Sequence, residues 1–156
     1  MAKSGSSDWA TAIAAAATSR NIHPSWNDYN FVRKIHRCAV TIKGGDANGD
    51  YYDLGPLMAE GARIVPEQCV IRYGGSGTTN FTARLDKIAA ADGTNTNLTT
   101  AVTCDASGVE VFAAAANTAP PTFKAADSLR LTLPAVTTAT AGRILLLEIA
   151  YDIPNC

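Results

Sequence analysis

The feature that most constrains the fold is a continuous apolar run near the C-terminus, residues 144–151. If these residues form a strand, aliphatic or aromatic side chains occupy both of its faces. A strand that is apolar on both faces is typical of the centre of a packed sheet or of a subunit interface. Asp152 and Pro154 follow, and because proline has no N–H to donate to a neighbouring strand, we expect the strand to end there.

The chain from residue 37 onward has the pattern of short strands separated by turns. Turn signals such as Asn48-Gly49 recur at spacings of roughly ten residues, which favours an all-β sandwich or barrel. Leucines alternate with polar residues in 128–133, as in a strand with one buried face. The expected strands are 38–43, 51–54, 62–65, 68–73, 81–88, 109–113, 128–133 and 143–151, with a weaker one near 98–103. We therefore predict an antiparallel two-sheet sandwich of jelly-roll type.

The core is expected to come mainly from the last two predicted strands. The side chains that we expect to be buried are Leu129, Leu131, Leu133, Ile144, Leu146 and Ile149. The chain shows no repeat of 20 to 50 residues, the period typical of solenoids and propellers.

Residues 1–36 differ from the rest and are expected to form an N-terminal arm, which leaves 37–156 as the β-sandwich domain. The arm begins with a Ser/Gly-rich leader, followed by an Ala-rich segment, 9–18, that favours a short helix. Both tryptophans and both histidines lie in the arm. Aromatic residues in a segment without a regular pattern either pack on their own domain or contact a partner.

Little in the sequence points to catalysis. It contains no P-loop, no G-x-S-x-G, no H-E-x-x-H and no G-x-G-x-x-G. The glycine-rich segment 74–77 precedes a predicted strand, whereas phosphate cradles open a helix. Residues 46–53 resemble a calcium loop, but Tyr51 and Leu57 stand where an EF-hand needs Gly and Glu, so a turn is favoured over a surface cation. We expect no enzyme, no catalytic or metal-binding residue and no cofactor.

Charge and hydropathy also bear on possible partners. The net charge is −1, which offers no electrostatic reason to expect nucleic acid or an anionic membrane surface as a partner. No apolar run approaches the length of about 18 residues that a transmembrane helix needs. The N-terminus lacks the apolar core of a signal peptide, so we expect synthesis and retention in a cytoplasm.

The four cysteines, Cys38, Cys69, Cys104 and Cys156, are spread along the chain without a C-x-x-C pair. Zinc sites usually draw their ligands from close pairs, so a metal is not favoured. Cys38 and Cys69 lie in apolar strand-like runs, where a thiol behaves as a small hydrophobic side chain. Buried thiols are the favoured interpretation, with a disulfide linked to assembly as the alternative. Cys156 is terminal and open to cross-linking.

Four segments together resemble a known family. Leu-Gly-x-Leu in 54–57 is followed by Gly-Ala-Arg-Ile in 61–64 and a proline, and Phe-x-Ala-x-Leu-Asp occupies 81–86. A leucine-alternating segment, 126–133, precedes a final Thr-Ala-Gly-Arg-Ile-Leu strand in 140–151. Over about residues 50–153 this order resembles the small β-sandwich virion proteins of tailed bacteriophages, the head decoration or cement proteins. Residues 1–36 have no counterpart in that pattern.

The resemblance implies a non-enzymatic virion protein with a jelly-roll-like domain that binds the outer surface of a phage capsid and stabilises the shell. It implies synthesis in the host cytoplasm, a place on the capsid surface, and two partners: the major capsid protein and the protein itself as a homo-oligomer, a dimer or trimer. A rigid domain with an aromatic arm suits adhesion, because the symmetry of a shell multiplies weak contacts.

The arm is the expected docking element. Within it, 33–37 is a basic cluster that either forms a solvated face or docks on an acidic patch of a protein partner. The residues expected to contact the capsid or another subunit are Trp9, Ile13, Trp26, Tyr29, Phe31, Arg33, Lys34 and Arg37. The alternative function is a receptor- or carbohydrate-binding spike or fibre component, for which Tyr51, Tyr52 and Tyr73 would be the candidate aromatic platforms.

Overall fold

The computed structural model describes residues 31–55, 59–74, 81–105, 108–115, 120–137 and 143–154. Apart from one short 3-10 helix, η1, the regular elements in these residues are all strands. In chain order they are β1 (Phe31–Thr41), β2 (Tyr51–Gly55), β3 (Arg63–Ile64), η1 (Pro66–Gln68), β4 (Val70–Gly74), β5 (Phe81–Ile88), β6 (Asn95–Asn97), β7 (Val102–Cys104), β8 (Gly108–Val111), β9 (Ser128–Thr132) and β10 (Ile144–Pro154). The predicted all-β fold is confirmed. The predicted helix over 9–18 lies outside the described residues.

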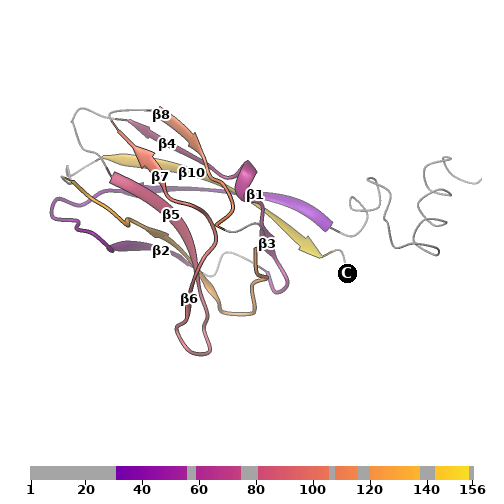
Figure 1. Cartoon of the computed structure of the whole chain (residues 1–156). Coiled ribbons are helices and arrows are strands. Elements are labelled where there is room, and N and C mark those ends of the chain that lie inside the picture. The colour runs from indigo at the N-terminus through magenta and orange to yellow at the C-terminus, as the bar shows by residue number, and fades with distance from the viewer. Residues whose placement is uncertain are drawn as a thin grey trace, which may run out of the picture.

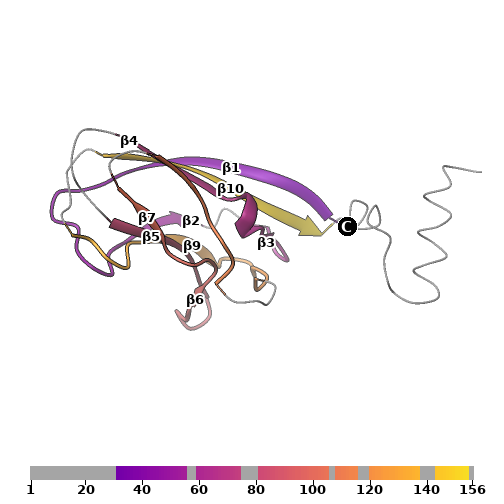
Figure 2. The ribbon, with the colours of Figure 1, turned by 45° about the horizontal axis from the view of Figure 1, so that its top comes forward.

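The strands form two antiparallel sheets. Sheet A has the order β1-β10-β4-β8, with β3 also paired to β10, and sheet B has the order β2-β9-β5-β6, with β7 also paired to β5. In Figure 2, β1, β10 and β4 lie in the upper layer and β2, β5 and β9 in the lower one. The chain crosses repeatedly between the sheets, and its first and last described strands pair with each other, as in a jelly roll.

The core fills the space between the sheets. Leu145, Leu147 and Ile149 of β10 point inward from sheet A and are fully buried. The same holds for the inward-facing residues of sheet B, among them Ala83, Leu85, Leu129 and Leu131. The expected burial of Leu129, Leu131, Leu133 and Ile149 is confirmed. The expectation was wrong for two residues, Ile144 and Leu146, which are 51% and 49% exposed. Successive side chains of a strand alternate between faces, and these two lie on the face of β10 that points away from sheet B.

The pairing of β1 with β10 is longer than the sequence pattern indicated. Its register runs without interruption from Phe31 opposite Pro154 to Thr41 opposite Ile144, so residues 31–36 are part of a strand. The predicted stop at Asp152 was wrong because that carboxylate pairs with Arg33 directly across the strands, where Nη2 donates to Oδ2 at 3.0 Å. Pro154 is only the last residue of the strand, a position that proline tolerates. Figure 1 shows the two strands running side by side past the rest of the sandwich.

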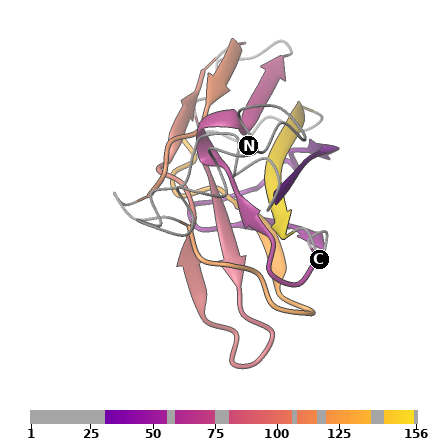
Figure 3. The same cartoon turned by 90° about the vertical axis from the view of Figure 1, so that its right-hand side faces the viewer.

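Strands β5 and β6 of sheet B form a hairpin. β5 and β6 are joined through residues 89–94, where the N–H of Ala89 donates to the carbonyl of Thr94 at 3.0 Å. Gly93 has a φ of +74°, a left-handed conformation that glycine adopts without strain. Viewed from the end at which β10 stops, this hairpin reaches out beyond the other strands at the bottom of Figure 3.

A buried carboxylate, Asp127, fixes the approach to β9 and makes stability depend on pH. It accepts hydrogen bonds from the N–H groups of Lys124 at 2.8 Å and Ala90 at 3.0 Å, and lies 3.0 Å from Nζ of Lys87. These contacts, led by the two backbone N–H groups, lower the pKa of Asp127 from 3.8 to about 2.

A folded-state pKa below the unfolded value means that this carboxylate stabilises the fold fully above about pH 4 and progressively less as the pH falls towards 2. We therefore expect thermal melting between pH 5 and pH 2 to show a steeper loss of stability for the wild type than for Asp127→Asn. If the melting temperature falls equally with pH in the two proteins, the stabilising role of the ionised Asp127 is contradicted.

Candidate functional site

Large exposed apolar side chains gather on one surface, the outer face of sheet A. The members, each about half exposed, are Ile35 of β1, Ile144 and Leu146 of β10, and Val109 and Val111 of β8. The register places them together, because Leu146 lies opposite Arg72 of β4 and Arg72 lies opposite Val109. Sheet faces that point to water are normally polar, so this face departs from the usual pattern.

The centre of the face holds three charged side chains. Oε1 of Glu148 lies 3.5 Å from Nε of Arg37 on β1 and 4.0 Å from Nε of Arg72 on β4. The two arginine side chains are 71% and 50% exposed. Two guanidinium groups against one carboxylate leave an excess positive charge. These three charged side chains, together with Leu146 and Ala39, border a depression of about 330 Å³ over β10.

The structure divides the basic cluster 33–37 between two faces. Alternation along β1 puts Arg33 and Arg37 on the outer face, where they pair with Asp152 and Glu148, and turns Lys34 to the opposite side. Arg33 also donates to Gln68 of η1. The cluster is thus no continuous basic patch.

Most of the other predicted contact residues fall outside the part of the chain that the structure describes. Trp9, Ile13, Trp26 and Tyr29 lie outside the described residues, and Phe31 is the first residue of β1. Sequence reasoning missed the outer face itself. The signal was present in the apolar run 144–151, one face of which meets the core and the other solvent.

The outer face of sheet B is polar, in contrast to that of sheet A. Asp86 is fully buried there by its partners: Nε and Nη2 of Arg84 donate to it at 2.7 and 2.9 Å, and Oγ1 of Thr132 donates at 2.7 Å. Beside this network the guanidinium of Arg130 stacks on the ring of Tyr51, 4.0 Å from its centre.

This arrangement bears on the carbohydrate hypothesis. Of its three candidate tyrosines, Tyr51 is exposed but carries Arg130 on its ring, Tyr52 is half-buried and hydrogen-bonds to Asp46, and Tyr73 is buried. Sugar platforms need an open aromatic face, which none of the three presents fully.

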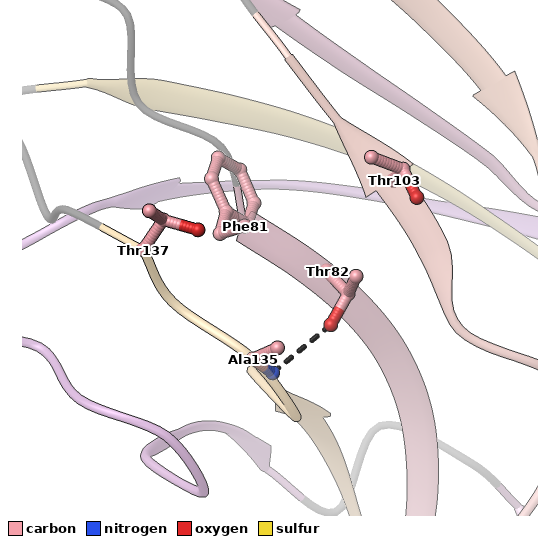
Figure 4. Close-up of a pocket in the computed structure, with 5 residues that line it drawn as sticks. All are labelled: Phe81, Thr82, Thr103, Ala135 and Thr137. Carbon is pink, nitrogen blue, oxygen red and sulfur yellow. Dashed lines mark hydrogen bonds between the residues drawn. The ribbon is translucent and has the colours of Figure 1, made fainter.

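A second hollow, of about 150 Å³, lies at one end of sheet B and is shown in Figure 4. Phe81 and the threonines Thr82, Thr103 and Thr137 line it with Ala135, whose N–H donates to Oγ1 of Thr82 at 3.0 Å. The described residues that line it include neither a carboxylate nor an imidazole nor a thiol, so they offer no general base to activate a threonine hydroxyl.

The cysteines in the described part of the chain behave as buried thiols. Cys69 and Cys104 are fully buried, Cys38 is half-buried, and none of the three forms a disulfide. Burial raises the pKa of Cys69 to about 11 and that of Cys104 to about 12, which keeps both protonated at neutral pH. Cys156 lies outside the described residues.

The acidic turn 46–53 uses its carboxylates internally. Asp46 accepts a hydrogen bond from the N–H of Lys43 at 3.0 Å and one from the hydroxyl of Tyr52, while Asp50 accepts from the N–H of Ala47 at 2.7 Å. The turn interpretation is confirmed, with Gly49 at a φ of +89°. In the ranges that the structure describes, no three His, Cys, Asp or Glu side chains cluster closely enough to hold a metal ion, and no helix has the length and apolarity to cross a membrane.

Comparison with known proteins gives a likeness in fold. No protein-family model and no curated protein matches the sequence. A chain in the solved capsid of Ralstonia phage GP4 matches with a TM-score of 0.60 and 18% identity, over 80% of this chain and 86% of that chain. A chain in the capsid asymmetric unit of cyanophage Pam1 aligns over 99% of this chain and 100% of that one, with a TM-score of 0.47 and 13% identity. The first of these matches shows that this chain shares its fold with a chain of a phage capsid.

Proposed function

We propose that this protein is a non-enzymatic structural component of a phage virion that binds the outer surface of the capsid and stabilises the shell. The observation that carries the proposal is the fold shared with a chain of the Ralstonia phage GP4 capsid, at 18% identity. The resemblance of residues 50–153 to head decoration proteins supports the same role. The major capsid protein is then the principal partner, and self-association as a dimer or trimer is a further expectation.

The surface of the sandwich suits adhesion. A β domain of two packed sheets presents half-exposed aliphatic side chains on the outer face of sheet A. Contacts of modest strength become durable on a capsid, because many equivalent copies and sites act together.

The direct test is binding of the purified protein to capsids assembled without it. We expect the protein to co-sediment with such capsids at a fixed ratio per shell, and the decorated shells to withstand higher temperature than bare ones. Binding that is absent, or that brings no gain in shell stability, would contradict the proposal.

Residues 1–30 are proposed to contribute to this binding through Trp9, Ile13, Trp26 and Tyr29, since aromatic anchors often dominate protein interfaces. Deletion of residues 1–30 is expected to leave the sandwich folded and to weaken co-sedimentation with bare capsids by about tenfold or more. Circular dichroism checks the fold of the truncated protein. Full-strength binding after the deletion would leave the sandwich as the sole docking element.

A further inference from the structure

We propose that the outer face of sheet A is a docking surface for a protein of the virion shell, whose own contacting surface is apolar and presents a carboxylate. This inference rests on the proposed function and assigns to it a surface whose residues all lie outside 1–30.

The first argument is the apolar character of the face. The described part of the chain has six large apolar side chains that are exposed. Five of them lie on this face: one on β1, two on β10 and two on β8, with Arg72 of β4 between β10 and β8. Clustered apolar side chains of this kind mark interaction sites, because leaving them in water forgoes the free energy of burial. The outer face of sheet B provides an internal comparison: its centre is a network of Arg84, Asp86 and Thr132.

The second argument is the charge at the centre. Glu148 contacts Arg37 and Arg72 only at 3.5 and 4.0 Å, beyond good hydrogen-bond distance. Both guanidinium groups therefore have N–H groups available for another acceptor. Each guanidinium is planar and can form two parallel hydrogen bonds with a carboxylate. They flank an open depression in which a carboxylate of the partner fits between them.

The same charges argue against a second copy as the occupant. Two copies packed face to face would bring two centres of excess positive charge together in a surface from which water is excluded, which is unfavourable. An apolar partner with a carboxylate avoids this repulsion. Its binding buries Leu146 and the neighbouring apolar side chains, and its carboxylate pairs with the guanidinium groups.

The experiment compares matched substitutions on the two outer faces. Leu146→Arg and Tyr51→Arg each replace a half-exposed apolar side chain with arginine, on sheet A and sheet B respectively. Each variant is titrated against capsids assembled without the protein. We expect Leu146→Arg to weaken binding by about tenfold or more and Tyr51→Arg to bind as the wild type does. Val109→Arg, on β8, repeats the test in case Leu146→Arg fails to fold.

Two charge substitutions on this face provide a second test, because they are expected to change the affinity for capsids in opposite directions. Glu148→Gln removes the competing carboxylate, so binding to the capsid is expected to strengthen, whereas Arg72→Gln is expected to weaken it. The two effects are expected to shrink as the salt concentration rises.

The possible outcomes separate this inference from the proposed function. If the wild type binds and Leu146→Arg and Val109→Arg bind equally well, the docking surface is overturned and the proposed function stands. If the wild type does not bind capsids, both the docking surface and the proposed function are contradicted. A solution oligomer that Leu146→Arg dissociates would assign the face to contacts between copies and overturn the inference. Binding of a hydrophobic dye that appears only after deletion of residues 1–30 would assign the face to the chain's own arm, with the same consequence.

Discussion

Replacing Leu147 with alanine is expected to lower the free energy of unfolding by about 2–5 kcal/mol, whereas the same change at Leu146 should cost less than about 1 kcal/mol. The two leucines are neighbours on β10, but Leu147 is 1% exposed in the core and Leu146 is 49% exposed on the outer face. Truncation of the buried side chain removes apolar contacts and leaves a cavity, whereas truncation of the exposed one removes side-chain atoms that already contact water.

Urea denaturation of the two variants and the wild type measures the difference. The pair controls for strand position and residue type, since only the face differs. Equal losses of unfolding free energy in the two variants would mean either that the faces of β10 are exchanged or that the outer face is covered in solution.

Replacement of Asp86 with alanine is expected to cost about 3–5 kcal/mol, because it leaves the guanidinium of Arg84 without its counter-charge in a buried network. The carboxylate is fully buried and accepts hydrogen bonds from Arg84, from the hydroxyl of Thr132 at 2.7 Å and from Nδ2 of Asn95 at 3.3 Å. These contacts join β5, β6 and β9, so the loss affects three of the five strands of sheet B.

A double-mutant cycle isolates the ion pair from its surroundings. The Arg84→Ala, Asp86→Ala double variant should be more stable than the sum of the two single losses predicts, by about 1–3 kcal/mol. Strictly additive losses in urea denaturation would show that Arg84 and Asp86 do not depend on each other.

Local pattern predicted the strands well where one face is buried and the other polar. Strand β5 was predicted with the bounds that the structure has, and β9 to within one residue. The start of β1 was missed by seven residues, because the basic cluster 33–37 indicates a solvated or docking segment when read along the chain. In the structure this part of β1 reaches beyond the body of the sheet, where charges on both faces meet water or a cross-strand partner.

The candidate site was harder to predict than the fold. A strand apolar on both faces indicated either a central strand or an interface, and nothing in the run itself tells which of its faces meets the core. Moreover, Val109, Arg72 and Leu146 are far apart in the sequence and become neighbours only through the register of three strands. Composition pointed instead to the aromatic residues of the arm, whose part in binding stays a prediction.

The pairing of the first described strand with the last has a consequence for biogenesis. β10 lies between β1 and β4 and is hydrogen-bonded to both, so sheet A cannot assemble until residues 144–154 have left the ribosome. Contacts of such long sequence separation also make folding slow. A nascent or prematurely terminated chain therefore keeps β1 unpaired, and only chains translated through β10 can form the outer face of sheet A.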